Sequence, residues 1–155
     1  MVYNGQKWVE SQGEDRYRRG IYTYYRRTSG YPGQLTFDAP SRDLCSARRL
    51  VSNTPLQALV TMNDPAHIEA AQGLAKRMAA HSAEVPAQLA FGVLLATQQS
   101  ASPAMIAELV SLTTATAADY QQAPADSAKL AETPVAAALV LTANTILNLD
   151  SALTR

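Results

Sequence analysis

Arginines and tyrosines are concentrated near the start of this chain, where they could bind an anionic or ring-bearing partner. The candidates are Arg18, Arg19, Tyr22 and Tyr25. Guanidinium groups form paired hydrogen bonds with phosphate, sulfate or carboxylate groups, and aromatic rings stack on bases and sugars. A structural role is the alternative, because tyrosines at helical spacing often pack at the edge of a core and arginine stems cover apolar surface. The residue types favour the structural role and leave binding open.

A second set of charged residues follows in a stretch without clear periodicity. Its members are Asp38, Arg42, Asp43, Arg48 and Arg49. Paired charges of this kind can hold an irregular segment in place by giving its backbone groups partners. The same residues could instead act on an anionic polysaccharide, with the two aspartates as acid and base and the arginines as anion ligands. Nothing in the sequence fixes the separation of the two carboxylates, so both alternatives remain open.

Recognised catalytic and cofactor motifs are absent from the sequence. Cys45 is the only cysteine, so an intrachain disulfide and a cysteine-based zinc site are excluded. We expect it to be a small buried apolar residue rather than a nucleophile. His67 and His81 fall at opposite ends of one predicted helix and cannot share a metal ion. Because the glycine-rich phosphate loop, the nucleophile elbow and the haem-attachment motif are also missing, we predict no catalytic residue, metal site or cofactor in this chain.

Composition and charge describe a folded domain rather than a disordered or nucleic-acid-binding chain. Hydrophobic residues make up 47% of the 155 residues and charged residues 17%, which suffices for a buried core. With zero net charge and an isoelectric point near 6.7, we do not expect nucleic acid as a partner. Residues 1–50 nevertheless carry nine basic and five acidic side chains, a net charge of +4, and the remainder carries −4. This asymmetry indicates two parts of one domain that attract each other, or a face that binds a polyanion.

Four helix starts are marked by a capping residue directly before a proline. The side-chain oxygen of the cap can accept a hydrogen bond from a free amide, and proline at the first helical position loses no needed donor. The four pairs are Thr54-Pro55, Asp64-Pro65, Ser102-Pro103 and Thr133-Pro134. They predict helices near residues 55–62, 65–81, 103–121 and 134–149. The last helix is apolar but too short to span a membrane, so we expect it in the core.

Apolar spacing predicts two further helices and completes an all-α fold of five to six helices. The first, near 86–99, is apolar almost all round and should be central. The second, near 15–28, aligns tyrosines as one stripe, although Gly20 weakens it. We expect an irregular helical domain with a long ordered loop in its N-terminal part. It would be one domain, 1–155, with a loose arm at 1–14, a Tyr/Arg motif region at 15–65 and a helical region at 66–155.

The order of motifs resembles a bacterial domain of unknown function, number 1553, also called the planctomycete PSD domain. The resemblance rests on one long block and a short closing motif. They comprise Tyr17-Arg18-Arg19, Ile21-Tyr22-Thr23, Leu35-Thr36-Phe37-Asp38-Ala39-Pro40, Arg42, Cys45, Arg48-Arg49, Asn53-Thr54-Pro55-Leu56-Gln57-Ala58-Leu59, Asn63-Asp64-Pro65 and Leu147-Asn148-Leu149-Asp150. The resemblance implies no assigned activity or catalytic residue.

This resemblance also implies a cellular context. Members of the family are typically large exported proteins in which the domain often lies downstream of a cytochrome-c-like domain. We therefore expect the chain to be the C-terminal part of such a protein, in the periplasm or cell envelope, with any haem in an upstream domain. The chain itself shows no signal peptide at its start. We predict a non-enzymatic accessory module that binds the upstream domains or an envelope protein.

Overall fold

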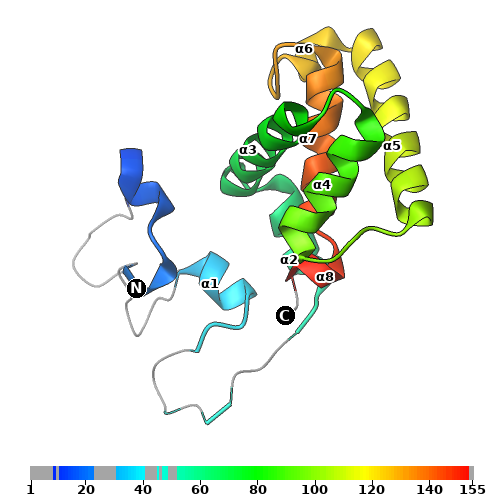
Figure 1. Ribbon diagram of the computed structural model, residues 1–155. Helices are drawn as coiled ribbons and strands as arrows, with labels where there is room; N and C mark the ends of the chain where they lie inside the picture. Colours follow the sequence, from blue (N-terminus) through cyan, green and yellow to red (C-terminus); the bar gives the residue numbers. More distant parts are fainter. Residues whose placement is uncertain are drawn as a thin grey trace. The chain divides into compact units, whose positions relative to one another are not determined.

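The computed structural model describes residues 9, 11–22, 31–40, 45, 47–48 and 52–153. The chain divides into two compact units, Met1–Asn53 and Thr54–Arg155 (Figure 1). Every regular element within the described ranges is a helix, which confirms the predicted all-α fold. No described helix is both long and apolar enough to cross a membrane. The expected division into one domain with an arm and a motif region remains a prediction.

All four capped helices begin where the sequence predicts. In each case the residue before the proline accepts a hydrogen bond from an amide of the first turn. The first cap is reciprocal: the Gln57 amide donates to Thr54 Oγ1 at 3.3 Å, and the Thr54 amide donates to Gln57 Oε1 at 3.0 Å. The helices are α2 (Pro55–Asn63), α3 (Pro65–His81), α5 (Pro103–Gln122) and α7 (Pro134–Leu147).

The core of the second unit is built around α7. Eight residues of this helix are buried, half of them alanine or threonine, and it packs most extensively against α5 and α3 (Figure 1). Its small side chains allow several helices to approach one axis closely. The core also takes buried apolar side chains from the three neighbouring helices: Ala71, Leu74, Ala75, Met78, Leu89, Val93 and Leu109.

The helix predicted near 86–99 is α4 (Val85–Thr97), but α7 rather than α4 occupies the centre. Leu89 is fully buried, whereas Leu94 is 46% exposed, so the apolar residues of α4 are divided between core and solvent. α4 lies close to α3 at Gly92, where an added Cβ would come within 2.6 Å of the Met78 sulfur. The helix ends at Gln98, whose φ of 58° is left-handed.

The first unit contains only short helices in its described part. They are the 3₁₀-helices η2 (Gly13–Tyr17) and η3 (Gly20–Tyr22) and the α-helix α1 (Pro32–Thr36). The α-helix predicted near 15–28 is therefore wrong over residues 15–22. The chain leaves helical geometry at Arg18, whose φ of −70° and ψ of 145° are extended, and Gly20 adds a residue that favours helix weakly.

Three short helices lie in segments for which the sequence predicts none. α1 begins at Pro32, inside the stretch expected to be an irregular loop. α6 (Pro124–Ser127) lies in the polar linker before α7, and α8 (Asp150–Leu153) follows α7. Each has only four or five residues, which is too short for a recognisable apolar period.

Candidate functional site

The two 3₁₀-turns of the first unit present apolar and basic side chains to solvent. Tyr17, Ile21 and Tyr22 are 72%, 74% and 65% exposed. The Tyr22 amide donates a hydrogen bond to the Arg19 carbonyl oxygen at 2.9 Å and closes the turn of η3. We call the exposed residues of these turns the Tyr/Arg surface; it consists of Tyr17, Arg18, Arg19, Ile21 and Tyr22.

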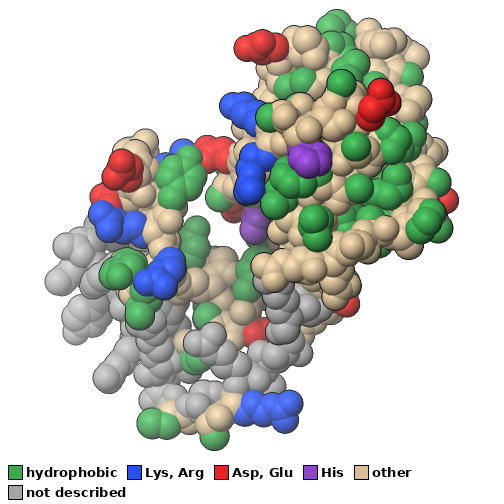
Figure 2. Space-filling model, viewed as in Figure 1, with side chains coloured by type: hydrophobic (Ala, Val, Ile, Leu, Met, Phe, Trp, Pro, Cys, Tyr) green, Lys and Arg blue, Asp and Glu red, His purple; other side chains and the backbone are tan. Residues whose placement is uncertain are grey.

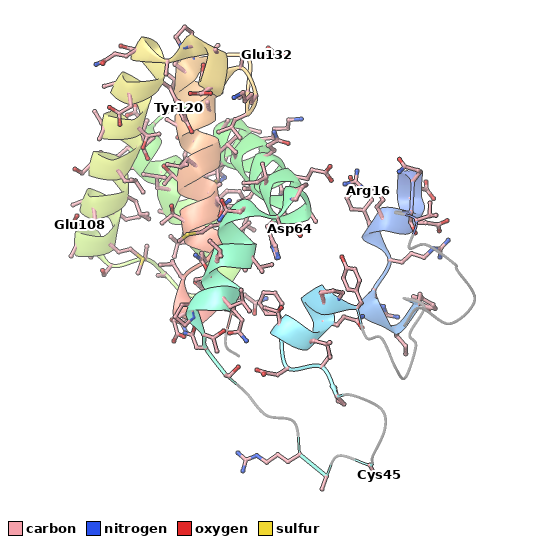
Figure 3. The ribbon with its side chains drawn as sticks, turned by 180° about the vertical axis from the view of Figure 1, so that it is seen from behind. Arg16, Cys45, Asp64, Glu108, Tyr120 and Glu132 are labelled. Atoms are coloured by element: carbon pink, nitrogen blue, oxygen red, sulfur yellow. The ribbon has the colours of Figure 1, made fainter. Side chains whose placement is uncertain are left out.

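A cationic group lies beside the Tyr17 ring of this surface. The Arg16 guanidinium carbon is 5.9 Å from the centre of the Tyr17 ring, within cation–π range (Figure 3). Arg18 donates through Nε to an Asp15 carboxylate oxygen. Both side chains of this pair are about 60% exposed, so the pair contributes little to stability and Arg18 can exchange Asp15 for another carboxylate. Figure 2 shows basic, acidic and apolar side chains interspersed on the visible face of the first unit.

A side-chain hydrogen bond connects η3 to the helix that follows it in the described sequence. Gln34 of α1 donates through Nε2 to the Gly20 carbonyl oxygen at 3.3 Å. An added Cβ at Gly20 would lie 3.0 Å from the same Gln34 nitrogen, so the two segments are in close contact there. The Tyr/Arg surface is thus held to α1 by a polar contact.

Asp38 closes the loop that ends the first unit. Its Oδ2 accepts hydrogen bonds from the amide and the hydroxyl of Ser52, each at 2.7 Å. Asp38 itself has a left-handed φ of 57°, a conformation that aspartate and asparagine tolerate better than most residues. The preceding turn is fixed by the Ala39 amide, which donates to the Gln34 carbonyl at 2.9 Å. The carboxylate therefore joins two residues that lie 14 positions apart in the chain.

The predicted site residues are distributed over two parts of the first unit. Arg18, Arg19 and Tyr22 come together on the Tyr/Arg surface, whereas Asp38 lies at the loop closure. Arg48 is exposed in the same loop. The other predicted site residues, Tyr25, Arg42 and Arg49, lie outside the described residues, as does Asp43, the second carboxylate of the acid–base alternative. The proposed binding roles of these residues remain predictions.

The structure contradicts the expectation for Cys45 and confirms the predicted position of His81 at the end of a helix. Cys45 is exposed, so the expectation of a buried apolar residue is wrong; the described part of its unit has no core to receive it (Figure 3). His81 ends α3 as predicted and stacks on Phe91 of α4, with ring centres 3.9 Å apart. No three metal-ligating side chains cluster among the residues that the structure describes.

Sequence reasoning missed two residues that position this region. Ser52 supplies both donors to Asp38, and Gln34 ties α1 to η3. Both contacts join residues 14 positions apart, and no periodic pattern or capping motif connects such residues. Only the turn-forming character of Asp38 before Ala39-Pro40 was a local signal of a fixed conformation.

The fold and this surface define an all-α chain with an exposed polar–aromatic region and a separate helical core. Residues 2–113 match the family PSD1, described as a protein of unknown function (DUF1553), and the chain belongs to this family. The match includes the Tyr/Arg surface, the Asp38 loop and helices α2 to α4, and it ends within α5. The closing motif Leu147-Asn148-Leu149-Asp150 lies beyond it. No curated protein and no solved structure matches the chain.

Proposed function

We propose that this chain is a non-enzymatic interaction module of a larger exported protein. It binds another part of that protein, or a partner in the cell envelope, through the Tyr/Arg surface. Its location is then the periplasm or cell envelope, and any haem belongs to a cytochrome-c-like domain encoded upstream. The family of the chain is one of unknown function, so the support for this role comes from the exposed surface itself.

The observation that carries the proposal is the exposure of large apolar side chains in the described part of the first unit. None of its described residues is buried, although it carries three tyrosines, a phenylalanine and several aliphatic residues in its described part. The large exposed side chains are Val9, Tyr17, Ile21, Tyr22, Tyr31, Leu35 and Phe37. Apolar surface of this kind is stabilised when a partner covers it, and tyrosine and arginine are the residues most often enriched where partners bind.

The chemistry of the surface indicates what the partner must supply. Exposed rings require an apolar contact surface, and the two arginines require carboxylates or carbonyl oxygens in place of water. The Arg18–Asp15 pair provides one such carboxylate while the surface is free. A protein surface with apolar residues surrounded by acidic ones meets both requirements.

A binding measurement with the upstream part of the parent protein tests the proposal. The chain is titrated calorimetrically with the polypeptide encoded immediately upstream in the same reading frame. We expect binding, and we expect Tyr22→Ser and Ile21→Ser each to weaken it at least tenfold. Val135→Ser is the matched control, since Val135 is 59% exposed on α7 of the second unit. Its affinity should equal that of the unaltered chain.

Two outcomes would overturn the proposal. The first is an absence of binding to the upstream polypeptide at concentrations up to the millimolar range. The second is tight, salt-sensitive binding to a sulfated polysaccharide that Arg18→Gln and Arg19→Gln abolish while Tyr22→Ser leaves it intact. That result would favour the anionic-polysaccharide alternative.

A further inference from the structure

Helix α2 is attached to the second unit without contributing an apolar side chain to its core. The hydrophobic core formed by the described residues takes side chains from α3, α4, α5 and α7 and none from α2. The two buried residues of α2, Gln57 and Thr61, are polar, whereas Leu56, Leu59 and Met62 are each more than half exposed. Burial of apolar area is the main force that holds a helix on a core, so α2 receives little of that stabilisation.

Side-chain hydrogen bonds join α2 to the C-terminal end of α7. Thr61 Oγ1 lies 2.7 Å from Asn148 Oδ1, to which it can donate. Asn144 Nδ2 donates to the Met62 carbonyl oxygen at 3.4 Å, a long and therefore weak bond. We call these two contacts, made by Thr61, Met62, Asn144 and Asn148, the polar latch. Its net contribution to stability is small, because water can replace each partner when the contact opens.

The Thr61 hydroxyl has other acceptors within its own helix. Its oxygen lies 3.1 Å from the Gln57 carbonyl oxygen and 3.0 Å from the Ala58 carbonyl oxygen. A hydroxyl has one proton, so these two oxygens and Asn148 Oδ1 compete for it. Separation of α2 from α7 therefore leaves this donor with a partner.

The ends of α2 are also held by bonds that do not involve α7. The reciprocal cap at Thr54 closes its start, and Asn63 Nδ2 donates to the Leu59 carbonyl oxygen at 2.8 Å near its end. The next residue, Asp64, has an extended backbone and caps α3 by accepting a hydrogen bond from the Ala66 amide. Rotation about the φ angle of Asp64 turns α2 relative to α3 and leaves this cap intact. Asp64 is therefore a joint between the two helices.

We propose that α2 opens from the second unit as one element, turning about Asp64 while α3, α4, α5 and α7 stay folded. The docked and open states differ by the polar latch and by little apolar burial, so opening does not require global unfolding. Because α2 is the first helix of the second unit, opening frees its nine residues to lengthen the connection that leads from the first unit into α3. The polar latch thus sets the length of that connection.

Amide hydrogen exchange of the full chain, followed residue by residue by nuclear magnetic resonance, tests the opening. We expect the amides of residues 59–63 to share one opening equilibrium and to exchange roughly tenfold faster or more than those of residues 138–142 in α7. Thr61→Val and Asn148→Ala each remove one side of the polar latch. Each should speed exchange in α2 by roughly threefold or more and leave exchange in α7 unchanged.

Thr114→Val is the matched control for Thr61→Val. Thr114 is an exposed residue of α5 that donates to the Val110 carbonyl oxygen at 2.9 Å, so it makes the same kind of bond within its own helix but has no part in the polar latch. Its replacement should change the exchange rate of neither helix. The double variant Thr61→Val with Asn148→Ala should exchange no faster in α2 than the faster single variant, because both remove the same contact.

Thiol labelling provides an independent measurement. In a Cys45→Ser background, Thr61→Cys and Ala75→Cys place the same thiol at two positions that are each 4% exposed. Ala75 belongs to the hydrophobic core, so labelling there requires the core to open, whereas labelling at position 61 requires only α2 to open. We expect position 61 to react roughly tenfold faster or more.

Three results would overturn the proposal. Exchange of the α2 amides at the rate of the α7 amides, or equal labelling of positions 61 and 75, would mean that α2 opens only when the whole unit unfolds. Exchange that slows steadily from residue 59 to residue 63 would mean fraying from one end. Equal acceleration of α2 and α7 by Asn148→Ala would mean that the polar latch supports the core. Neither measurement involves the Tyr/Arg surface, so failure here is distinguishable from failure of the proposed function.

Discussion

The two units of this chain are held in their folded conformations by different interactions. The second unit buries thirteen apolar residues around α7 and orders its backbone by that burial. The described part of the first unit buries none and is ordered by local turns and by side-chain hydrogen bonds such as those between Asp38 and Ser52. Burial offsets conformational entropy far more effectively than isolated hydrogen bonds do. The second unit is therefore the stable scaffold.

The two units also differ in what their side chains can do: those of the second unit stabilise the fold, whereas those of the first unit can contact a partner. In the second unit even polar side chains are satisfied in the core: the Thr113 and Thr142 hydroxyls lie 2.9 Å apart, and no buried side-chain polar atom among the described residues lacks a partner. In the first unit aromatic and basic side chains reach solvent. Residues that add nothing to an internal core are available for a partner, which is why the two units should respond differently to substitution.

Substitutions of large aliphatic residues should give the largest contrast between the units. Leu89→Ala removes a fully buried side chain from α4 and should lower the free energy of unfolding by about 3 kcal/mol, since it leaves a cavity. Ile21→Ala, at a 74% exposed position of the first unit, should change it by no more than about 0.5 kcal/mol. Urea unfolding followed by circular dichroism measures both.

An equal loss for the two variants would break this comparison. It would mean that Ile21 belongs to a core from which the scaffold draws stability, and the interaction role of the Tyr/Arg surface would then lose its basis. Conversely, a small loss for Leu89→Ala would show that the helices around α7 can collapse onto the vacated space.

Sequence reasoning succeeded where the physical cause was local. The caps at Thr54, Asp64, Ser102 and Thr133 lie within one turn of the groups they satisfy, so four helix starts could be predicted from adjacent residues. The all-α class followed from the same pattern. Family resemblance, confirmed over residues 2–113, likewise rested on contiguous motifs.

Features that depend on distant partners could not be predicted. Helix α2 buries the polar Thr61 and exposes Leu59. This orientation depends on Asn148, which lies 87 positions from Thr61 and can accept its hydroxyl hydrogen. The role of Asp38 depends on Ser52, and the central place of α7 depends on small side chains that several neighbours approach at once. The helix expected near 15–28 is wrong over residues 15–22, because the apolar spacing suggested a buried face whereas Tyr17 and Ile21 are 72% and 74% exposed.

Removing the Asp38 anchor should have a smaller effect, confined to the first unit. Asp38→Ala deletes the acceptor for Ser52. It also places alanine at a left-handed φ, which alanine adopts less readily than aspartate. Together these changes should cost about 2 kcal/mol of local stability. Asp38→Asn keeps an acceptor and tolerates this φ, so it should cost less than half as much. Limited proteolysis between residues 38 and 52 measures the difference, and Ser52→Ala should not add to Asp38→Ala.

The outcome of that experiment sharpens the contrast between the units. Faster cleavage of the loop with an unchanged urea midpoint for the helical unit would show that the anchor orders only its own segment. A matching fall in the urea midpoint would instead show that the loop supports the core, and the two units would have to be treated as one cooperative structure.

The smallest expected effect concerns a tyrosine of the scaffold at alkaline pH. Burial raises the pKa of Tyr120 above its ordinary value of 10.0, and the negative charge of Asp126 raises this pKa further (Figure 3). The folded state thus holds the phenolic proton more tightly than the unfolded state does. The stability that this provides is fully present below about pH 10 and is lost as the pH rises through the raised pKa.

Melting temperatures between pH 9 and pH 11 test this dependence. Tyr120→Phe should fall less steeply with pH than the unaltered chain, because it has no phenol to ionise on unfolding. Asp126→Asn should lie between the two, since it removes the charge and leaves the burial. Identical slopes for Tyr120→Phe and the unaltered chain would contradict the assignment.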